Sequence, residues 1–443
     1  MPENCPQDYA QKLGAMIRIP TISKSENEDL SAFYEFQAEL ARLFPLLHTN
    51  LQKTDLNGTL IFHWKGSDPK KKPILLMGHQ DVVPANDNGW RVPAFSGQVV
   101  DGALYGRGAI DCKGHLFTIL QAIEELLEEG FVPPCDIYLE SSINEETRGN
   151  GARNAAHYFE KNNIQFSIVI DEAGTILEQP IAGMDKPYAV IGVTEKGYMD
   201  LKITAKGTGG HSSTPPRKTP VARLFAFANE IEKKRPFKRV LLPEAQEMFH
   251  RMAPAFRFPL RFLLGNIWFF KPLLINILPR ISPFGEALLS TTCCFTMMQG
   301  AKAPNVIPKE PYLVANLRTA VHQDCEASLL VIKKYAAKYD LEVEVLQKNE
   351  PSPISDINSK EYGYLESCIR KQFPDIGIAP YIIMGGTDCR YFHSLTKNAF
   401  RFSPLRTTTA QINACHAVNE NVTLSALTEA VAFFKVFIKE YYV

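Results

Sequence analysis

Short apolar runs alternate with stretches of helical apolar spacing over the first 190 residues of the chain. Runs this short suit buried strands, whereas apolar positions every three to four residues suit helices that cover a sheet. Strands are therefore expected at 73–77, 136–142 and 166–170, and helices at 113–129 and 152–162. The alternation predicts an α/β fold with a mostly parallel sheet and helices on both faces. In such sheets, functional side chains gather at the carboxyl ends of the strands.

The pattern changes near residue 191. Residues 198–205 (YMDLKITA) alternate with period two, as in an antiparallel strand with one face in water. The following elements are expected as a helix at 220–234, strands at 293–298 and 312–319, a helix at 325–338 and a strand at 342–346. Together they form an α+β module of the type βαββαβ.

After about residue 350 the alternation of short apolar runs with helical spacing resumes, with a strand expected at 381–384 and a final helix at 424–441. We therefore expect one α/β domain made of residues 1–190 and 350–443. The α+β domain, residues 191–349, is expected as an insertion into it.

Segment 236–290, inside the inserted domain, is unusually rich in Phe, Leu, Ile and Pro. One interpretation is an extra packed helical subdomain. Another is an apolar wall at the mouth of a site for a greasy substrate, or a surface that contacts a membrane. The sequence leaves these alternatives open.

Composition and charge narrow the class of protein. Hydrophobic residues make up 45% and charged residues 22%, and 48 basic residues balance 48 acidic ones, which is ordinary for a soluble globular protein. This balance argues against a nucleic-acid partner. Charged and polar residues interrupt every long apolar stretch, so no integral membrane association is expected.

The expected location is the cytoplasm. The first residues, MPENCPQDYAQKL, lack the basic start and apolar run of a signal peptide. The nine cysteines are an odd number and contain no CxxC pair, so they are expected as reduced thiols.

The first patch with candidate chemistry is Gly-His-Gln-Asp, directly after the strand expected at 73–77. In an extended chain His79 and Asp81 point the same way, so Asp81 is placed to orient the imidazole of a metal ligand. Taken alone, a histidine at a strand end is more often simply packed or exposed.

Two further patches supply carboxylates. Asp111 lies in 105–114 (YGRGAIDCKG), which by itself could be a turn with an N-cap Asp. Glu145 and Glu146 follow the strand expected at 136–142. Two adjacent carboxylates at a strand exit are unfavourable unless cations neutralise them.

The remaining patches are Asp171-Glu172, after the strand expected at 166–170, and His416 near the end of the chain. All five patches together supply two histidines and several carboxylates, mostly at strand exits. Such a set suits two zinc ions about 3.5 Å apart, with one carboxylate bridging them and another acting as general base.

These separated motifs resemble the aminoacylase, glutamate carboxypeptidase and succinyl-diaminopimelate desuccinylase superfamily of co-catalytic zinc hydrolases. The resemblance covers nearly the whole chain and is greatest to Gly-X carboxypeptidases and N-fatty-acyl-amino-acid hydrolases. It implies a zinc-peptidase-like catalytic domain with an inserted lid or dimerisation domain. It also implies an amidohydrolase that cleaves an amide bond adjacent to a free carboxylate.

The resemblance assigns roles in the first domain. It implies two Zn²⁺ per chain, replaceable by Co²⁺ or Mn²⁺ in vitro, and it makes Glu145 the general base and Asp81 the residue that orients the first ligand. The implied metal ligands are His79, Asp111 as the bridge, Glu146, Asp171 and His416. Cys112 departs from the family, which commonly has Asp, Met or Ala after the bridging Asp.

The resemblance also assigns roles in substrate binding. His211, in Gly-Gly-His-Ser-Ser, would polarise the scissile carbonyl, and Asn305 and Arg318 would bind the substrate carboxylate. The turn 385–388 (Gly-Gly-Thr-Asp) would hold the substrate backbone, chiefly through Gly385, Gly386 and Thr387. Relatives often form a homodimer through their lid domains, so a homodimer is one possibility for this chain.

The substrate implied is an N-acyl amino acid or a short peptide. A dipeptidase acting on ordinary peptides is the alternative within enzymes. A non-catalytic metal-dependent binding protein is the alternative from another class, since a fold does not prove activity. The presence of Glu145 and of every expected ligand type disfavours it.

Overall fold

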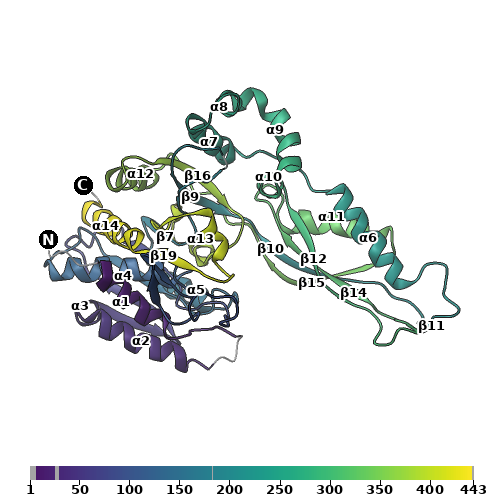
Figure 1. Cartoon of the computed structure of the whole chain (residues 1–443), viewed down its shortest axis with the longest axis horizontal. Helices are drawn as coiled ribbons and strands as arrows, with labels where there is room; N and C mark the ends of the chain where they lie inside the picture. Colours follow the sequence, from purple (N-terminus) through teal and green to yellow (C-terminus); the bar gives the residue numbers. More distant parts are fainter. Residues whose placement is uncertain (1–5, 25–28, 182, 442–443) are drawn as a thin grey trace.

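The computed structural model describes residues 6–24, 29–181 and 183–441 of the 443-residue chain. A broad α/β body carries a narrower α+β domain that extends from one side (Figure 1). Both the beginning and the end of the chain, purple and yellow in Figure 1, belong to the body. The fold class expected from the sequence is therefore confirmed.

The body is built on a ten-stranded sheet in the order β1-β2-β6-β3-β7-β17-β9-β8-β18, with β16 also paired to β9. Its strands are β1 (Gln52–Leu56), β2 (Thr59–Trp64), β3 (Ile74–Met77), β6 (Ile137–Ser141), β7 (Ile168–Asp171), β8 (Thr175–Leu177), β9 (Tyr188–Glu195), β16 (Gly377–Ile383), β17 (Ala399–Arg401) and β18 (Arg406–Thr407). The central strands β6, β3, β7 and β17 run parallel, and Leu76 of β3 lies opposite Leu139 and Ile170. The first three expected strands are present as β3, β6 and β7.

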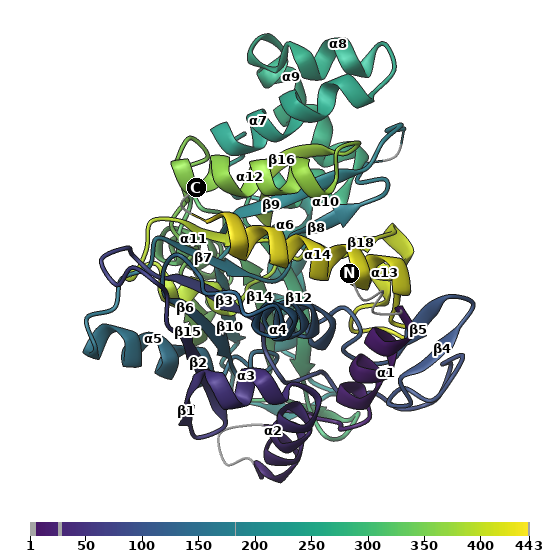
Figure 2. The same ribbon diagram turned by 90° about the vertical axis from the view of Figure 1, so that its left-hand side faces the viewer.

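Helices cover both faces of this sheet (Figure 2). One face carries α1 (Pro6–Ile17), α2 (Ser31–Leu43), α3 (Pro45–Asn50), α4 (Lys113–Glu128), α12 (Lys360–Gln372) and α14 (Leu424–Glu440), and the other carries α5 (Gly151–Lys161). Successive residues of a strand point to opposite faces. Accordingly Leu76 packs with the first helix layer, whereas Leu75 and Met77 pack with α5.

The narrower domain is an antiparallel four-stranded sheet in the order β12-β14-β10-β15, with two helices on one face. Its elements are β10 (Tyr198–Thr204), α6 (Pro220–Lys234), β12 (Thr292–Gln299), β14 (Tyr312–Arg318), α11 (Cys325–Ala337) and β15 (Glu342–Asn349). A short pair, β11 (Gly210–His211) with β13 (Val306–Ile307), lies at its far end (Figure 1). This chain order is the βαββαβ module expected from the sequence.

The structure shifts the first domain boundary. β9 spans residue 191 and pairs with β8, β16 and β17, so residues 191–195 belong to the main sheet. All residues of β9 are buried, and the alternation typical of a half-exposed strand begins only with β10. The inserted domain therefore begins at Tyr198.

Segment 236–290 forms a helical subdomain that packs against the body. Its elements are α7 (Pro243–Met252), η1 (Ala253–Ala255), α8 (Leu260–Gly265), α9 (Ile267–Ile281) and α10 (Pro283–Leu289). Met248 and Leu274 share a buried cluster with Tyr188 of β9 and Ala379 of β16. Most of the buried residues of this segment therefore cover β9 and β16 of the body, whereas Phe237 packs in the core of the inserted domain. Among the described residues, no helix is long and apolar enough to cross a bilayer.

A buried ion network ties a surface turn to the main sheet. Glu195, at the end of β9, accepts hydrogen bonds from Arg401 Nε at 2.7 Å and Arg390 Nη2 at 2.8 Å. It also accepts the backbone N–H and the hydroxyl of Thr387 at 2.8 and 2.9 Å. Glu195 and Arg401 are both fully buried, so each charge depends on its partner for compensation. The network holds the turn that contains Gly385, Gly386 and Thr387.

Replacing Glu195 with alanine should lower the free energy of unfolding of the body by about 3–5 kcal/mol, because Arg401 would stay buried without a carboxylate. Glu342→Ala removes an exposed ion pair with Lys206 and should change the free energy of unfolding by less than about 1 kcal/mol. Urea unfolding followed by tryptophan fluorescence measures both variants. An equal loss of unfolding free energy in both variants would contradict a larger contribution from the buried network than from the exposed pair.

Candidate active site

His79 and Asp81 follow β3 at the carboxyl end of the parallel strands, where the sequence placed them. His79 is buried, and its Nδ1 lies 3.0 Å from the backbone oxygen of Asp81 and 3.3 Å from Asp81 Oδ1. The Asp81 carboxylate accepts the N–H groups of Glu145 and Glu146 at 3.1 Å each, and the hydroxyl of Ser23 at 2.6 Å. With Nδ1 engaged in this way, Nε2 of His79 is the nitrogen left for a metal.

Asp111 lies between two histidines that are far apart in the sequence. Its Oδ1 is 3.1 Å from His79 Nε2, and its Oδ2 is 3.0 Å from His416 Nε2. His416 Nε2 is also 3.1 Å from Glu146 Oε2. One carboxylate thus faces two separate imidazoles, which is the arrangement that a carboxylate shared by two metal ions requires.

One buried ion pair positions the loops of both Asp111 and His416. The Asp111 loop follows β5 (Ala103–Tyr105), which pairs with β4 (Gln98–Val100) and β19 (Asn421–Thr423). Glu420 accepts three backbone N–H groups of this loop at 2.8–3.1 Å and pairs with Arg107 at 2.6 Å. Arg107 also donates to the backbone oxygen of Ala417, next to His416, at 2.8 Å. The sequence analysis did not single out Glu420 or Arg107, because neither carries reactive chemistry.

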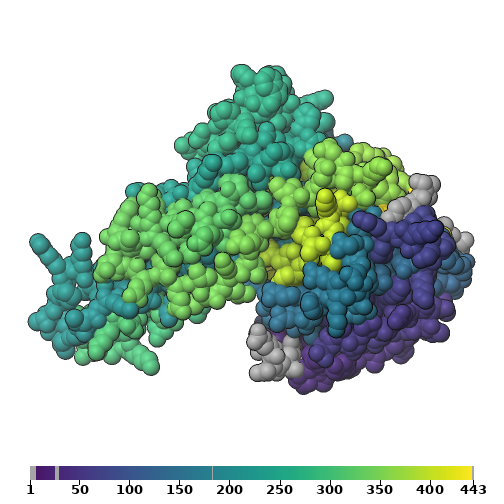
Figure 3. Space-filling model, turned by 180° about the vertical axis from the view of Figure 1, so that it is seen from behind, coloured from purple at the N-terminus to yellow at the C-terminus, as the bar shows by residue number. Residues whose placement is uncertain are grey.

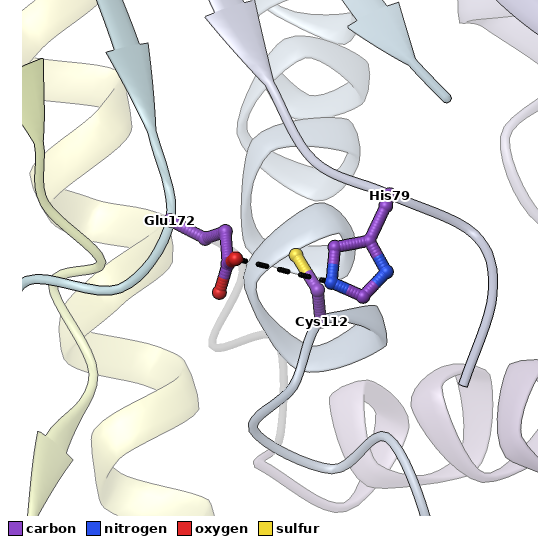
Figure 4. A group of neighbouring side chains, drawn as sticks. All are labelled: His79, Cys112 and Glu172. Atoms are coloured by element: carbon purple, nitrogen blue, oxygen red, sulfur yellow. Dashed lines mark ion pairs between the residues drawn. The ribbon is translucent and has the colours of Figure 1, made fainter. Parts of the chain in front are cut away.

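The structure brings Glu172, and not Asp171, to this cluster, which corrects the choice of ligand made from the sequence. Glu172 Oε1 lies 3.9 Å from His79 Nε2, with the Cys112 thiol beside both groups (Figure 4). The carboxylate oxygens of Asp171 instead accept the N–H groups of Glu172 and Cys389, both at 2.8 Å. Neighbouring side chains at a strand end point in opposite directions, so only one of the pair can reach the cluster.

The cluster concentrates negative charge in a poorly solvated place. Burial, together with the charges of Asp388 and Glu172, raises the pKa of Glu145 well above its usual range. Burial and the nearby Asp111 likewise raise the pKa of Glu172. Burial and the neighbouring Asp171 raise the pKa of Asp388 to about 7. These carboxylates are therefore difficult to ionise together without added positive charge.

The residues present fit divalent metal ions of the zinc type. Hydrogen bonds to Asp111 and Glu146 raise the pKa of His416 to about 10, a sign of strong local negative charge. Glu146 Oε1 is buried and has no hydrogen-bond partner in the described part of the chain. Within each of two groups, the possible ligand atoms lie within 4.8 Å of one another: His79 with Asp111 and Glu146, and His79 with Cys112 and Glu172. Imidazole and carboxylate donors in this number suit zinc.

A cavity of about 180 Å³ opens beside Glu145, Glu146 and His416. The residues expected to bind substrate that line it are Arg318, Gly385, Gly386 and Thr387. Asp388 of the same expected turn also lines it, and the residues that the sequence analysis did not single out are Arg148, Tyr198, Asn349, Arg390 and Tyr391. Segment 236–290, which is described in full, contributes no residue to this lining, so the interpretation of that segment as an apolar wall at the mouth is wrong.

Two arginines of this cavity share one aromatic ring. The guanidinium carbon of Arg148 lies 3.5 Å from the ring centroid of Tyr198, and that of Arg318 lies 4.9 Å from it. Neither arginine forms an ion pair with a residue that the structure describes. Both are thus available to a carboxylate of a bound molecule. A signal for Arg148 existed in the sequence, since it follows Glu146 by two residues in the same loop.

His211 and Asn305 lie elsewhere. His211 belongs to β11, and the backbone oxygen of Asn305 accepts the N–H of Ser212 at 3.1 Å. Both residues are exposed, and β11 lies at the tip of the inserted domain, away from the body (Figure 1). Within one chain the structure therefore separates these two residues from the metal-type cluster.

Comparison with known proteins gives consistent matches over nearly the full chain. "Probable carboxypeptidase S-like 2" of Dictyostelium discoideum is 34% identical over 98% of this chain and 85% of its own length. "N-fatty-acyl-amino acid synthase/hydrolase PM20D1" of Homo sapiens is 33% identical over 96% of this chain and 86% of its own length. The solved structure of the M20 family metallo-carboxypeptidase Sso-CP2 from Sulfolobus solfataricus has a TM-score of 0.71 at 20% identity, covering 98% of this chain and 99% of that one, a likeness in fold.

The sequence profile of "Peptidase family M20/M25/M40" matches residues 75–440, which include the whole metal-type cluster. The resemblance drawn from the motifs is thereby confirmed. With this match and the identities above 30% over nearly all of the chain, the protein belongs to peptidase family M20/M25/M40.

Proposed function

We propose that this hydrolase cleaves an amide bond next to a free carboxylate, in an N-acyl amino acid or a short peptide. One observation carries the proposal. Arg148 and Arg318, two arginines without ion-pair partners among the described residues, line the same cavity as Glu145 and His416. The names of the relatives, a carboxypeptidase S-like protein and an N-fatty-acyl-amino acid synthase/hydrolase, cover both substrate types.

The proposed metal content is two zinc ions per chain, with Asp111 shared between them. The proposed ligands are His79, Asp111, Glu146, Glu172 and His416. The support is that the two oxygens of Asp111 face different histidines. Ions bound there would acidify a water molecule and polarise the substrate carbonyl. Co²⁺ or Mn²⁺ should replace zinc in vitro, because imidazole and carboxylate donors accept them as well.

Glu145 is the proposed general base. Its backbone N–H is held by Asp81, the residue that also contacts His79, so the base and the first ligand are positioned together. A carboxylate with a raised pKa is suited to take a proton from water and to deliver it later to the leaving amine.

The proposed substrate carboxylate lies against Arg318 and Arg148. A guanidinium binds a carboxylate through two parallel hydrogen bonds, which would explain a demand for a free acid beside the scissile bond. The turn of Gly385, Gly386 and Thr387 would hold the substrate backbone, fixed in place by Glu195.

We further propose that His211 acts in the cavity of a second subunit, within a homodimer formed by the inserted domains. The position of β11 at the tip of that domain supports action between subunits rather than within one (Figure 1). The edge strand β12 also exposes Met297 (62%) and Met298 (59%), as a surface that pairs with a partner would.

A cytoplasmic location is proposed as well. The described cysteines are all free thiols, including the adjacent Cys293 and Cys294, which suits a reducing compartment.

Purified protein loaded with zinc should contain two metal ions per chain by elemental analysis. Glu172→Gln should retain about one, because it removes a ligand beside His79, whereas Asp171→Asn should retain two. If Asp171→Asn lost metal while Glu172→Gln retained two ions, Asp171 would be the ligand, as expected from the sequence.

Glu145→Gln should keep both metals yet lower kcat by about 10²–10⁴-fold, because the ligands remain while proton transfer is lost. Steady-state kinetics on metal-analysed samples measure this. Near-native turnover would exclude Glu145 as the base, and a loss of metal would make it a ligand instead.

A substrate panel tests the proposed function itself. N-lauroyl and N-acetyl amino acids should be hydrolysed, and their C-terminal amides should react at least about 30-fold more slowly, because the arginines would lose a charged partner. Arg318→Gln should remove most of this preference for the free acid. Rapid cleavage of Gly-Leu with no cleavage of either N-acyl substrate would favour the dipeptidase alternative.

Mixing inactive His211→Ala and Glu145→Gln chains should restore activity if the histidine acts between subunits, since one site of each heterodimer would be intact. Subunit exchange is verified with differently labelled chains. A mixture that exchanges and stays inactive would mean that His211 does not act in a second subunit.

A further inference from the structure

Helices α8 and α9 project from the body at one extremity of the molecule (Figures 1 and 2). Several large apolar side chains on and just before these helices are exposed. We call these side chains the α8–α9 apolar surface, which consists of Phe258, Leu260, Phe262, Trp268, Phe269, Leu273 and Ile277. Phe258 is 81% exposed, Trp268 75% and Phe269 64%. Soluble proteins seldom expose neighbouring aromatic rings to this extent without a binding partner.

The rings of this surface form a continuous chain of contacts. Phe258 contacts Phe262, with ring centroids 6.5 Å apart, and Phe262 contacts Phe270 at 5.8 Å. Phe270 contacts Phe269 at 5.0 Å, and Phe269 contacts Trp268 at 5.8 Å. The apolar side chains thus make one patch rather than isolated exposures.

One face of α8 and α9 is buried against the body, and the opposite face of α9 is exposed. Leu264, Ile267 and Leu274 are buried in the cluster that packs on β9 and β16. Phe269, Leu273 and Ile277, spaced four residues apart, share the outer face of α9. The hairpin is therefore apolar on two faces: the inner face is buried against the body, and the outer face is exposed.

The charges within the segment that carries the patch all have one sign, although the whole chain is neutral. Residues 248–285 contain no Asp or Glu. The basic residues on the projecting helices are Arg261, Lys271 and Arg280, and Arg257 lies just before α8. None of the four has an ion pair within the described residues. Exposed Trp and Phe next to unpaired basic residues are typical of segments that lie in the interface of an anionic bilayer.

We propose that the α8–α9 apolar surface docks this hydrolase on the surface of an anionic phospholipid membrane. A projecting hairpin suits a flat lipid surface, because this part of the chain stands out from the rest of the molecule (Figure 3). A second copy of the chain fits less well, because a two-fold contact would bring the same four basic residues of each copy together. Docking of this kind is independent of the reaction catalysed at the metal-type cluster.

The test uses the full zinc-loaded chain and vesicles of phosphatidylcholine with or without 30% phosphatidylglycerol. Native protein should co-sediment with the anionic vesicles and show a blue shift of tryptophan emission, because Trp268 enters the interface. Trp268→Phe should bind within a few-fold of the native chain but lose the shift. High salt should weaken binding.

Phe258→Ser with Phe269→Ser should weaken vesicle binding about 100-fold, about tenfold for each ring removed from the interface. Arg257→Glu with Arg261→Glu should weaken binding to anionic vesicles at least about 25-fold. Phe225→Ser, which changes a half-exposed ring on α6, is the matched control and should bind as the native chain does. Hydrolysis of a soluble N-acetyl substrate should be unchanged in these variants, so failure of docking is distinguishable from failure of the proposed reaction.

Two outcomes would overturn the proposal. In the first, native protein stays in the supernatant with both vesicle compositions. In the second, Phe258→Ser with Phe269→Ser converts a dimer into a monomer in light scattering, which would assign the surface to a second copy of the chain.

Discussion

The crowding of carboxylates at one end of the main sheet is the constraint on which the catalytic body depends. The side chains concerned are Asp81, Asp111, Glu145, Glu146, Glu172 and Asp388. Neighbouring groups compensate part of this negative charge. Backbone N–H groups point at Asp81, and two imidazoles point at Asp111. Divalent cations are the remaining compensation that such a buried group of like charges requires, which is why the cluster is better explained as a metal centre than as a structural feature.

Fully buried ion pairs outside the cluster position the loops that surround it. Glu420 and Arg107 connect the loop of Asp111 to the loop of His416, and Glu195 connects the substrate-binding turn to β9 and β17. In each case the carboxylate accepts hydrogen bonds both from an arginine and from backbone N–H groups. Such pairs contribute less to overall stability than to holding a few loops in one arrangement, because their desolvation offsets much of their attraction.

The division of the chain into body, inserted domain and helical projection separates three tasks. The body contains the metal-type cluster and most of the cavity lining, and the inserted domain adds Tyr198, Arg318 and Asn349 to that lining. The inserted domain also carries His211 on β11 at its tip, away from the metal-type cluster of the same chain. The projecting helices α8 and α9 meet neither of these sites, so their apolar surface can evolve toward a partner without changing the chemistry.

Much of this arrangement was determined by the sequence alone, because periodicity and motif are local properties. The alternation of apolar positions located β3, β6, β7, α4 and α5, and the motifs located His79, Asp111, Glu146 and His416. Three matters were decided only by the tertiary structure. Asp171 and Glu172 are adjacent carboxylates, and which one reaches the cluster depends on the direction in which β7 leaves the sheet. Residues 191–195 were expected in the inserted domain, but the pairing of β9 with β16 places them in the main sheet. The apolar content of 236–290 left open whether the segment packs or exposes an apolar surface, because the hydrophobic effect has no direction and leaves the choice of partner surface to the three-dimensional fold.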